Sequence, residues 1–99
     1  MHISADDVII VHINGELNFA TVPVLGKNNR NLILKNQRIV FDLSQVTSSD
    51  NTGVGLLVAL ASFAKSIRKE VSFINLPEQL LDLVEAVGVR EILPIKLQN

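Results

Sequence analysis

Three short runs of β-branched and other apolar residues predict three strands, at residues 8–13, 38–43 and 71–75. The first run is apolar on both of its sides apart from His12, which is typical of a strand that is covered over most of its surface. The second run is short and apolar enough to lie at the centre of a sheet. Residues 44–49 are polar and predict a loop after the second strand.

Apolar residues at helical spacing predict three helices, at residues 21–35, 50–68 and 77–87. A hydroxyl cap at Thr21 and a proline in the first turn mark the start of the first helix, because proline's missing N–H does no harm there. Gly88 is the predicted stop of the third helix, since glycine readily adopts the left-handed conformation that ends a helix.

Strands and helices alternate along the chain, which predicts an α/β fold with a mixed β-sheet of four to five strands and three or four helices packed against it. Residues 92–95 add either a last short strand or a packed tail. Right-handed crossovers should place successive strands side by side in parallel. The chain has 99 residues and no linker, repeat or low-complexity segment, so we expect residues 1–99 to form a single domain.

The balance of 47% hydrophobic and 19% charged residues is that of a globular protein. The formal net charge is −1, the nine Lys and Arg are scattered, and the four Phe are the only aromatic residues, so a nucleic-acid partner has little electrostatic basis. The chain has no cysteine, and its first residues do not show the basic and apolar stretches of a secretory signal, so none is expected. Its longest apolar-rich segment, residues 53–64, is too short to span a bilayer. We therefore expect a cytoplasmic protein without direct membrane insertion.

Groups that could carry catalysis are few. His2 and His12 are the only histidines, and no cluster of His or carboxylate residues has the spacing of metal ligands. Gly53 and Gly55 are followed neither by the Lys-Ser/Thr of a phosphate-binding loop nor by the third glycine of a dinucleotide site. The sequence therefore favours a non-enzymatic protein with no cofactor and no metal.

The most distinctive segment, residues 42–57, combines a buried strand, a polar stretch and the start of the second helix. Ser49 or Asp50 can cap this helix, where free backbone N–H groups and side-chain oxygens meet at one exposed place. Capping does not explain Gly53 and Gly55, since each glycine costs a helix about 1 kcal/mol relative to alanine.

The second helix has two unlike faces when its residues are placed at helical angles. The inward face is apolar and comprises Leu56, Leu57, Leu60, Phe63, Ala64 and Ile67, with Val54 and Ala61 at its margin. The opposite face is small and nearly uncharged, and it comprises Asn51, Thr52, Gly55, Val58, Ala59, Ser62 and Ser66. Small residues let another surface approach the helix backbone, and the missing charge lowers the cost of desolvation. This face is a predicted interface, with a chance run of small surface residues as the alternative.

One sequence pattern resembles a known family. It reads Asp42-Leu43-Ser44-x-Val46, then Asp50-x-x-Gly53-Val54, followed by an apolar helix. This pattern resembles the STAS domain family, whose members include bacterial anti-sigma factor antagonists and the MlaB component of the phospholipid ABC transporter that maintains outer-membrane asymmetry. The order of elements matches along essentially the whole chain. Residues 15–23 and 75–94 resemble the MlaB-like branch of the family.

The resemblance implies the STAS fold and a non-enzymatic domain whose second long helix docks on a partner. We expect this partner to be the cytoplasmic ATPase subunit of a phospholipid ABC transporter, which would hold the domain at the periphery of the inner membrane. The alternative partner is an anti-sigma kinase, with this chain acting as an anti-sigma factor antagonist. The expected contact residues are Asp50, which organises the helix start, and Asn51, Thr52, Gly55, Ala59 and Ser62. Whether two copies pair as a homodimer is left open.

In phosphorylated members of the family a Ser or Thr follows the Asp of the motif, and the resemblance places Asn51 at that position. Asn51 has no hydroxyl group. Thr52 lies one residue later and is expected to point elsewhere on the helix. We therefore expect no phosphorylation at this helix start, with Thr52 as the less favoured acceptor.

Overall fold

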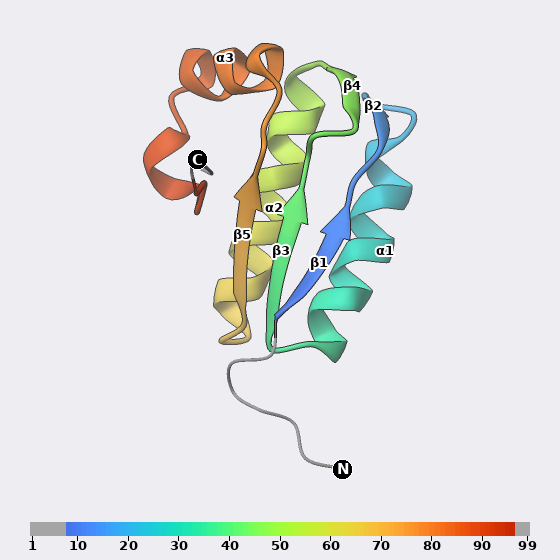
Figure 1. Cartoon of the computed structure of the whole chain (residues 1–99), viewed down its shortest axis with the longest axis vertical. Helices are drawn as coiled ribbons and strands as arrows, with labels where there is room; N and C mark the ends of the chain where they lie inside the picture. Colours follow the sequence, from blue (N-terminus) through green and yellow to red (C-terminus); the bar gives the residue numbers. More distant parts are fainter. Residues whose placement is uncertain (1–7, 97–99) are drawn as a thin grey trace.

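Three parallel strands form the centre of the computed structural model, which describes residues 8–96 (Figure 1). They are β1 (Ile9–His12), β3 (Arg38–Asp42) and β5 (Glu70–Ile74), and their order across the sheet is β1-β3-β5. Each strand begins and ends within one residue of the bounds that the apolar runs predict. The three predicted strands are therefore confirmed.

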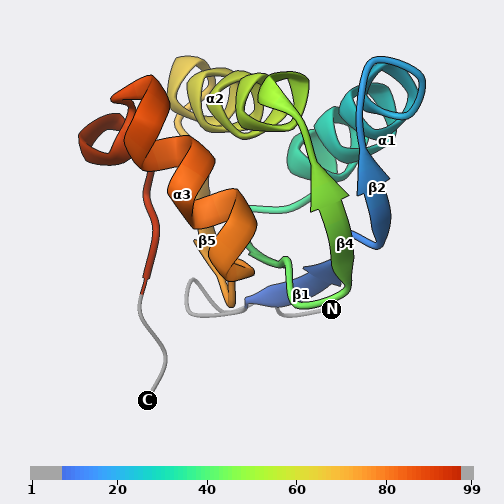
Figure 2. The same cartoon turned by 90° about the horizontal axis from the view of Figure 1, so that it is seen from above.

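Two helices cover one face of this sheet, as Figure 2 shows. They are α1 (Val22–Lys35) and α2 (Asn51–Ser66). Beneath them lies one apolar core, in which Phe41 and Phe73 of neighbouring strands stack with ring centroids 5.8 Å apart. The third helix, α3 (Glu78–Val87), packs against α2. All three predicted helices are confirmed, because each carries enough apolar residues at helical spacing to cover part of this core.

Two further strands, β2 (Gly15–Leu17) and β4 (Val46–Ser49), pair in parallel as a separate two-stranded sheet. The prediction of a loop over residues 44–49 is therefore wrong for residues 46–49. Val46 is buried in the core while the next two residues of β4 are exposed, so the segment is polar in composition although it is extended and paired. The pairing register between β2 and β4 shifts between Gly15 and Glu16.

The strands are arranged differently from the single mixed sheet of the prediction. The described residues 8–96 form five strands and three α-helices, and the α/β class is confirmed. Within residues 8–96 the strands divide into a three-stranded and a two-stranded sheet, and every pair in these sheets is parallel. Partners in each sheet are separated along the chain by a helix, and a helical crossover returns the chain in the same direction.

The start of α1 is stabilised differently from the prediction of a Thr21 hydroxyl cap. Thr21 stands at the capping position, but its side chain accepts no hydrogen bond from the helix. Its hydroxyl donates to the Glu16 carbonyl at 2.7 Å and accepts from the Asn18 N–H at 3.0 Å. The Asn18 side chain accepts from the N–H groups of Ala20 and Thr21, at 2.9 and 3.1 Å. Asn18 therefore organises the turn between β2 and α1, since a short amide side chain can replace a backbone acceptor.

The C-terminal part of the described chain packs as a tail against β5. Gly88 ends α3 in the left-handed conformation with φ of 84°, which confirms the predicted stop. A 3-10 turn at Arg90–Ile92 follows, and Ile95 forms an isolated parallel bridge with Phe73. Of the two predicted alternatives the packed tail is thus the better description. No helix in the part of the chain described here is long and apolar enough to cross a membrane.

Candidate functional site

The N-terminus of α2 is organised by Asp50, one of the two predicted caps. Its carboxylate accepts a hydrogen bond from the Thr52 N–H at 2.8 Å and another from the Thr52 hydroxyl. The bond from the hydroxyl is the main reason why the pKa of Asp50 lies below its usual range. The Asp50 N–H donates to the Leu17 carbonyl of β2 at 3.0 Å, which fixes the helix start against the two-stranded sheet. Ser49, the alternative cap, donates its hydroxyl to the Asp50 carbonyl instead.

The small-residue side of α2 is directed to solvent. The exposed residues are Asn51, Thr52, Gly55, Ala59, Ser62 and Ser66, whereas Val58 is half-buried. The first five of these are called the α2 face below. On the other side Leu56, Leu57 and Leu60 are buried. The orientation predicted from helical spacing is therefore confirmed, and contact between the α2 face and a partner stays a prediction.

The two glycines of α2 have different surroundings. Gly53 is buried, and a Cβ at this position would lie 1.9 Å from the Ser49 Oγ and 2.9 Å from the Leu17 Cβ. Glycine is therefore required at position 53 for the close approach of α2 to β2 and β4. A Cβ at Gly55 would meet nothing within 4 Å, so no neighbour within the described residues requires glycine there.

A large apolar side chain that the sequence analysis did not assign to the site lies near the start of α2. Phe19 is 79% exposed, in the turn between β2 and α1. This turn leaves β2 just after Leu17, whose carbonyl accepts the Asp50 N–H. In Figures 1 and 2 the turn lies at the same end of the molecule as the start of α2. A phenylalanine in a turn was the available signal, and among the described residues Phe19 has the highest exposed fraction of the large hydrophobic side chains.

A second polar cluster lies at the carboxyl ends of β1, β3 and β5. The Asp42 carboxylate accepts from the Ser44 N–H at 2.9 Å and from the Asn75 side chain at 3.3 Å, and it lies 3.7 Å from the His12 Nδ1. The bond from the Ser44 N–H is the main cause of the lowered pKa of Asp42. These groups bond to one another at the strand ends. Among residues 8–96 no three His, Cys, Asp or Glu side chains are grouped so that they could hold a metal ion.

A sequence model of the STAS domain matches residues 3–98. The chain belongs to the STAS domain family. The resemblance that the motif around Asp50 and Gly53 suggests is thereby confirmed at the level of the family. This STAS domain is similar to the anti-sigma-B factor antagonist of Bacillus subtilis (strain 168), with 28% identity over 91 residues. The aligned region covers 92% of this chain and 84% of that protein.

Two solved structures share the fold of this STAS domain. The anti-sigma factor antagonist SpoIIAA in its unphosphorylated form aligns with a TM-score of 0.74 at 13% identity, over 99% of this chain and 85% of that one. A candidate anti-sigma factor antagonist from Thermotoga maritima aligns with a TM-score of 0.81 at 23% identity, over 96% and 82% of the two chains. The predicted STAS fold is confirmed. The assignment of residues 15–23 and 75–94 to the MlaB-like branch is not confirmed by these comparisons.

Proposed function

We propose that this STAS domain is a non-enzymatic docking protein of the anti-sigma factor antagonist type, which binds a kinase-like anti-sigma partner through the α2 face. The observation that carries the proposal is the exposure of Asn51, Gly55 and Ala59 along one uncharged side of α2. The similarity to a protein named as an anti-sigma-B factor antagonist supports this class of partner. The transporter ATPase, which the sequence analysis placed first, is therefore placed second.

Docking on the α2 face is physically favourable because little has to be desolvated. No charged side chain lies between Asn51 and Ala64, and burial of a charge without a counter-charge is among the largest costs an interface can incur. In the part of the chain that the structure describes, no neighbouring atom lies within 4 Å of the place of a Cβ at Gly55, so a partner side chain can reach the helix backbone there. Phe19 supplies a large apolar anchor of the kind that contributes most to binding in many interfaces.

We propose further that docking is not switched by phosphorylation at this helix start. The side-chain amide of Asn51 has no hydroxyl to phosphorylate. The Thr52 hydroxyl is bonded to the Asp50 carboxylate, and a phosphate on Thr52 would lie against that negative charge. We expect intact-mass analysis of natively purified protein to show the unmodified mass. A dominant species that carries one phosphate on Thr52, Ser48 or Ser49 contradicts the proposal.

Asn51 also favours a second partner class, the ATPase subunit of a phospholipid ABC transporter. A docking domain with asparagine at position 51 suits constitutive binding better than partner switching. The resemblance of residues 15–23 and 75–94 to the MlaB-like branch supports this class as well. Mass spectrometry of proteins captured from native lysate separates the two classes. Recovery of an anti-sigma kinase supports the first, and recovery of an ABC-type ATPase supports the second.

The substitution Ala59→Arg tests the docking surface. Ala59 is exposed, so arginine would place a long charged side chain within the contact, and we expect at least about tenfold weaker binding of the partner. The free energy of unfolding of the isolated domain should change by no more than about 0.5 kcal/mol, as for other exposed substitutions. Partner titration and thermal unfolding of the same variant measure the two effects separately.

The matched control is Leu57→Ala on the inward side of the same helix. Leu57 is 0% exposed, so we expect this variant to lose about 2–5 kcal/mol of unfolding free energy while the α2 face keeps its residues. Normal partner binding by Ala59→Arg would show that the α2 face is not the docking surface. Unfolding of Ala59→Arg would show that the residue belongs to the core.

A further inference from the structure

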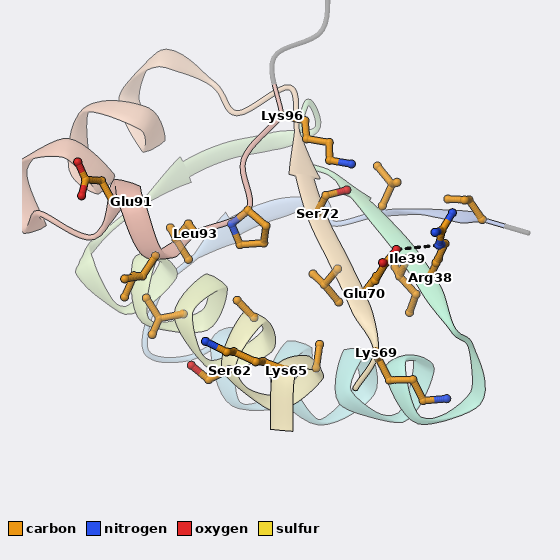
Figure 3. Close-up of a pocket in the computed structure, with 18 residues that line it drawn as sticks. Arg38, Ile39, Ser62, Lys65, Lys69, Glu70, Ser72, Glu91, Leu93 and Lys96 are labelled. Atoms are coloured by element: carbon orange, nitrogen blue, oxygen red, sulfur yellow. Dashed lines mark ion pairs between the residues drawn. The ribbon is translucent and has the colours of Figure 1, made fainter. Parts of the chain in front are cut away.

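A groove of about 640 Å³ borders the free edge of the three-stranded sheet, beside β5. One wall is the side of α2 at Ala61 and Ser62, and the other is the C-terminal tail at Leu93 and Pro94 (Figure 3). β5 lies between these walls and contributes Val71. The volume lies within the range of about 300–1,000 Å³ that is typical of binding pockets.

The tail already uses the edge of β5 at one residue. The Phe73 N–H donates to the Pro94 carbonyl, and the Phe73 carbonyl accepts from the Lys96 N–H, both at 2.9 Å. Ile95 is the parallel bridge partner of Phe73. This edge can therefore accept an extended segment of chain as an added strand.

Val71, two residues before Phe73, presents its backbone to the groove. Backbone groups of successive residues in a strand point to opposite sides, so the N–H and C=O of Val71 point away from β3 as those of Phe73 do. Glu70 has the opposite orientation, since its N–H donates to the Gln37 carbonyl at 3.0 Å. No strand within residues 8–96 lies against Val71 on the outer side of β5. One donor and one acceptor are therefore available to a segment of another protein.

The groove is more positive than the chain as a whole. Among residues 8–96, four cationic and two acidic side chains line it, in a chain of formal net charge −1. One of the acidic side chains, Glu70, is held in an ion pair with Arg38 at 2.7 Å. Lys65 of α2, Lys69 before β5 and Lys96 of the tail stand around the edge strand (Figure 3). The charge of a complementary ligand is therefore negative.

We propose that this groove binds an extended acidic peptide segment of a partner protein, which adds to the edge of β5 at Val71. Backbone pairing with Val71 aligns the segment, as in other recognition by strand addition. Acidic side chains of the segment meet Lys65 and Lys69, which adds electrostatic specificity. Apolar side chains of the segment contact the walls at Ala61 and Leu93.

Lysines at a sheet edge can also serve to keep copies of a chain from pairing through that edge. Lys69, directly before β5, is placed for such a role, whereas Lys65 lies on α2 and Lys96 on the tail. A role in preventing edge pairing also gives no reason for the apolar walls at Ala61 and Leu93. The proposal is independent of the docking function proposed above, because the groove is a separate surface that adjoins the α2 face only at Ser62 and the test uses no natural partner.

The test uses the isotope-labelled chain and a capped synthetic peptide of alternating valine and glutamate. We expect saturable binding that weakens as salt screens the lysines, with the Val71 amide resonance among those that shift most. The double substitution Lys65→Gln and Lys69→Gln should weaken binding at least about fivefold. The double substitution Lys27→Gln and Lys35→Gln removes the same charge at exposed positions outside the groove, and it should change binding by less than about twofold.

The proposal is overturned if the valine-glutamate peptide does not bind at millimolar concentration, or if a valine-lysine peptide binds equally well. Equal losses in the two double variants, or shifts confined to the α2 face, overturn it too. Urea unfolding of both double variants is expected to stay close to that of the unsubstituted chain, because Lys27, Lys35 and Lys65 are exposed and Lys69 is only half-buried. None of these results bears on partner binding by the α2 face.

Discussion

Two glycines in the first turns of α2 differ only in their surroundings. Gly53 is enclosed by Ser49 and Leu17, whereas Gly55 faces open space. We expect Gly53→Ala to destabilise the fold by about 1–3 kcal/mol, because the Leu17 Cβ cannot rotate out of the way. Gly55→Ala should stabilise the fold by up to about 1 kcal/mol, through the better helix propensity of alanine. Urea unfolding of the two variants measures both changes.

Opposite signs for the two glycine variants are the result that matters. If both substitutions stabilise the chain, the Ser49 and Leu17 side chains move aside easily and Gly53 is not required for packing. Titration of the Gly55→Ala variant with the partner adds a second measurement, since weaker binding by a more stable domain would show that the backbone at Gly55 is contacted.

The charge of Asp50 makes a contribution to stability that depends on pH. The Thr52 hydroxyl is the main cause of its lowered pKa in the folded chain. Folding therefore favours the ionised form, and the resulting stability is present above the unfolded pKa of about 3.9 and lost as the pH falls through the lower folded pKa. Asp50→Asn keeps a good cap without the charge. We expect the advantage of the unsubstituted chain over this variant, measured by urea unfolding, to be larger near about pH 7 than near about pH 3.

If the unfolding free energies of the unsubstituted chain and Asp50→Asn differ by the same amount at both pH values, the charge of Asp50 does not contribute to stability. The comparison is clean because Asp42, whose pKa is also lowered, titrates in both proteins and its contribution cancels. Asparagine also accepts the bond from the Thr52 N–H, so geometry is kept while ionisation is removed.

The exposure of single residues on α2 is predictable from the sequence because it follows from a local period of 3.6 residues. Asn51, Ala59 and Ser62 are exposed for this reason. The roles of Gly53 and Phe19 are not predictable in this way. Both depend on where β2 lies relative to α2, and that arrangement is set by contacts between segments far apart in the chain.

At the scale of elements, α3 is joined to the two-stranded sheet by one side chain. The Gln79 amide donates to the Ser49 carbonyl at 2.8 Å and accepts from the Ser49 N–H at 3.0 Å, so it pairs with β4 as a neighbouring strand would. We expect Gln79→Ala to cost about 1–2 kcal/mol of unfolding free energy, since two hydrogen bonds are lost. Hydrogen exchange of the Ser49 amide should become faster as well.

The control for Gln79→Ala is Asp82→Ala, an exposed substitution on the same helix that should stay within about 0.5 kcal/mol. Unchanged exchange of the Ser49 amide in Gln79→Ala would show that the two bonds are not formed in solution. An equal loss of unfolding free energy in Gln79→Ala and Asp82→Ala would show that the effect comes from substitution within α3 and not from the hydrogen bonds between Gln79 and β4.

Long or strongly apolar segments are the elements that the sequence predicts well. The three helices and the strands β1, β3 and β5 each show a periodicity of their own. β2 and β4 have only three and four residues, and β4 has two exposed polar residues in its middle. What makes them strands is their pairing with each other across α1 and β3, and no pattern within either segment reports that pairing.

At the scale of the whole molecule, the fold brings together charges from separate parts of the chain. Lys65 and Lys69 lie close together in the sequence, with Arg68 between them, whereas Lys96 lies near the C-terminus, in a chain whose formal net charge is −1. The local run of cations at residues 65–69 is visible in the sequence, but its closeness to Lys96 around one groove is not. The groove exists only because α2, the edge of β5 and the C-terminal tail are brought together, which is why sequence analysis could predict the α2 face but not this second surface.

The core extends as one cluster beneath the helices, so its loss should affect the whole domain at once. Phe73 lies in this cluster with 0% exposure, whereas Ile10 on the opposite face of the sheet is 60% exposed. No helix covers that opposite face within residues 8–96 (Figure 2). We expect Phe73→Ala to lower the free energy of unfolding by about 3–5 kcal/mol, a large part of the roughly 5–15 kcal/mol typical of a domain. Ile10→Thr should stay within about 0.5 kcal/mol, because threonine is a good strand former.

Urea unfolding followed by circular dichroism measures both variants. For Phe73→Ala the midpoint should fall while the transition remains a single step, because one cluster unfolds cooperatively. A comparable loss in Ile10→Thr would mean that Ile10 is covered in solution. If that loss also depended on protein concentration, the cover would be a second copy of the chain, since association stabilises by mass action and a single chain does not respond to dilution.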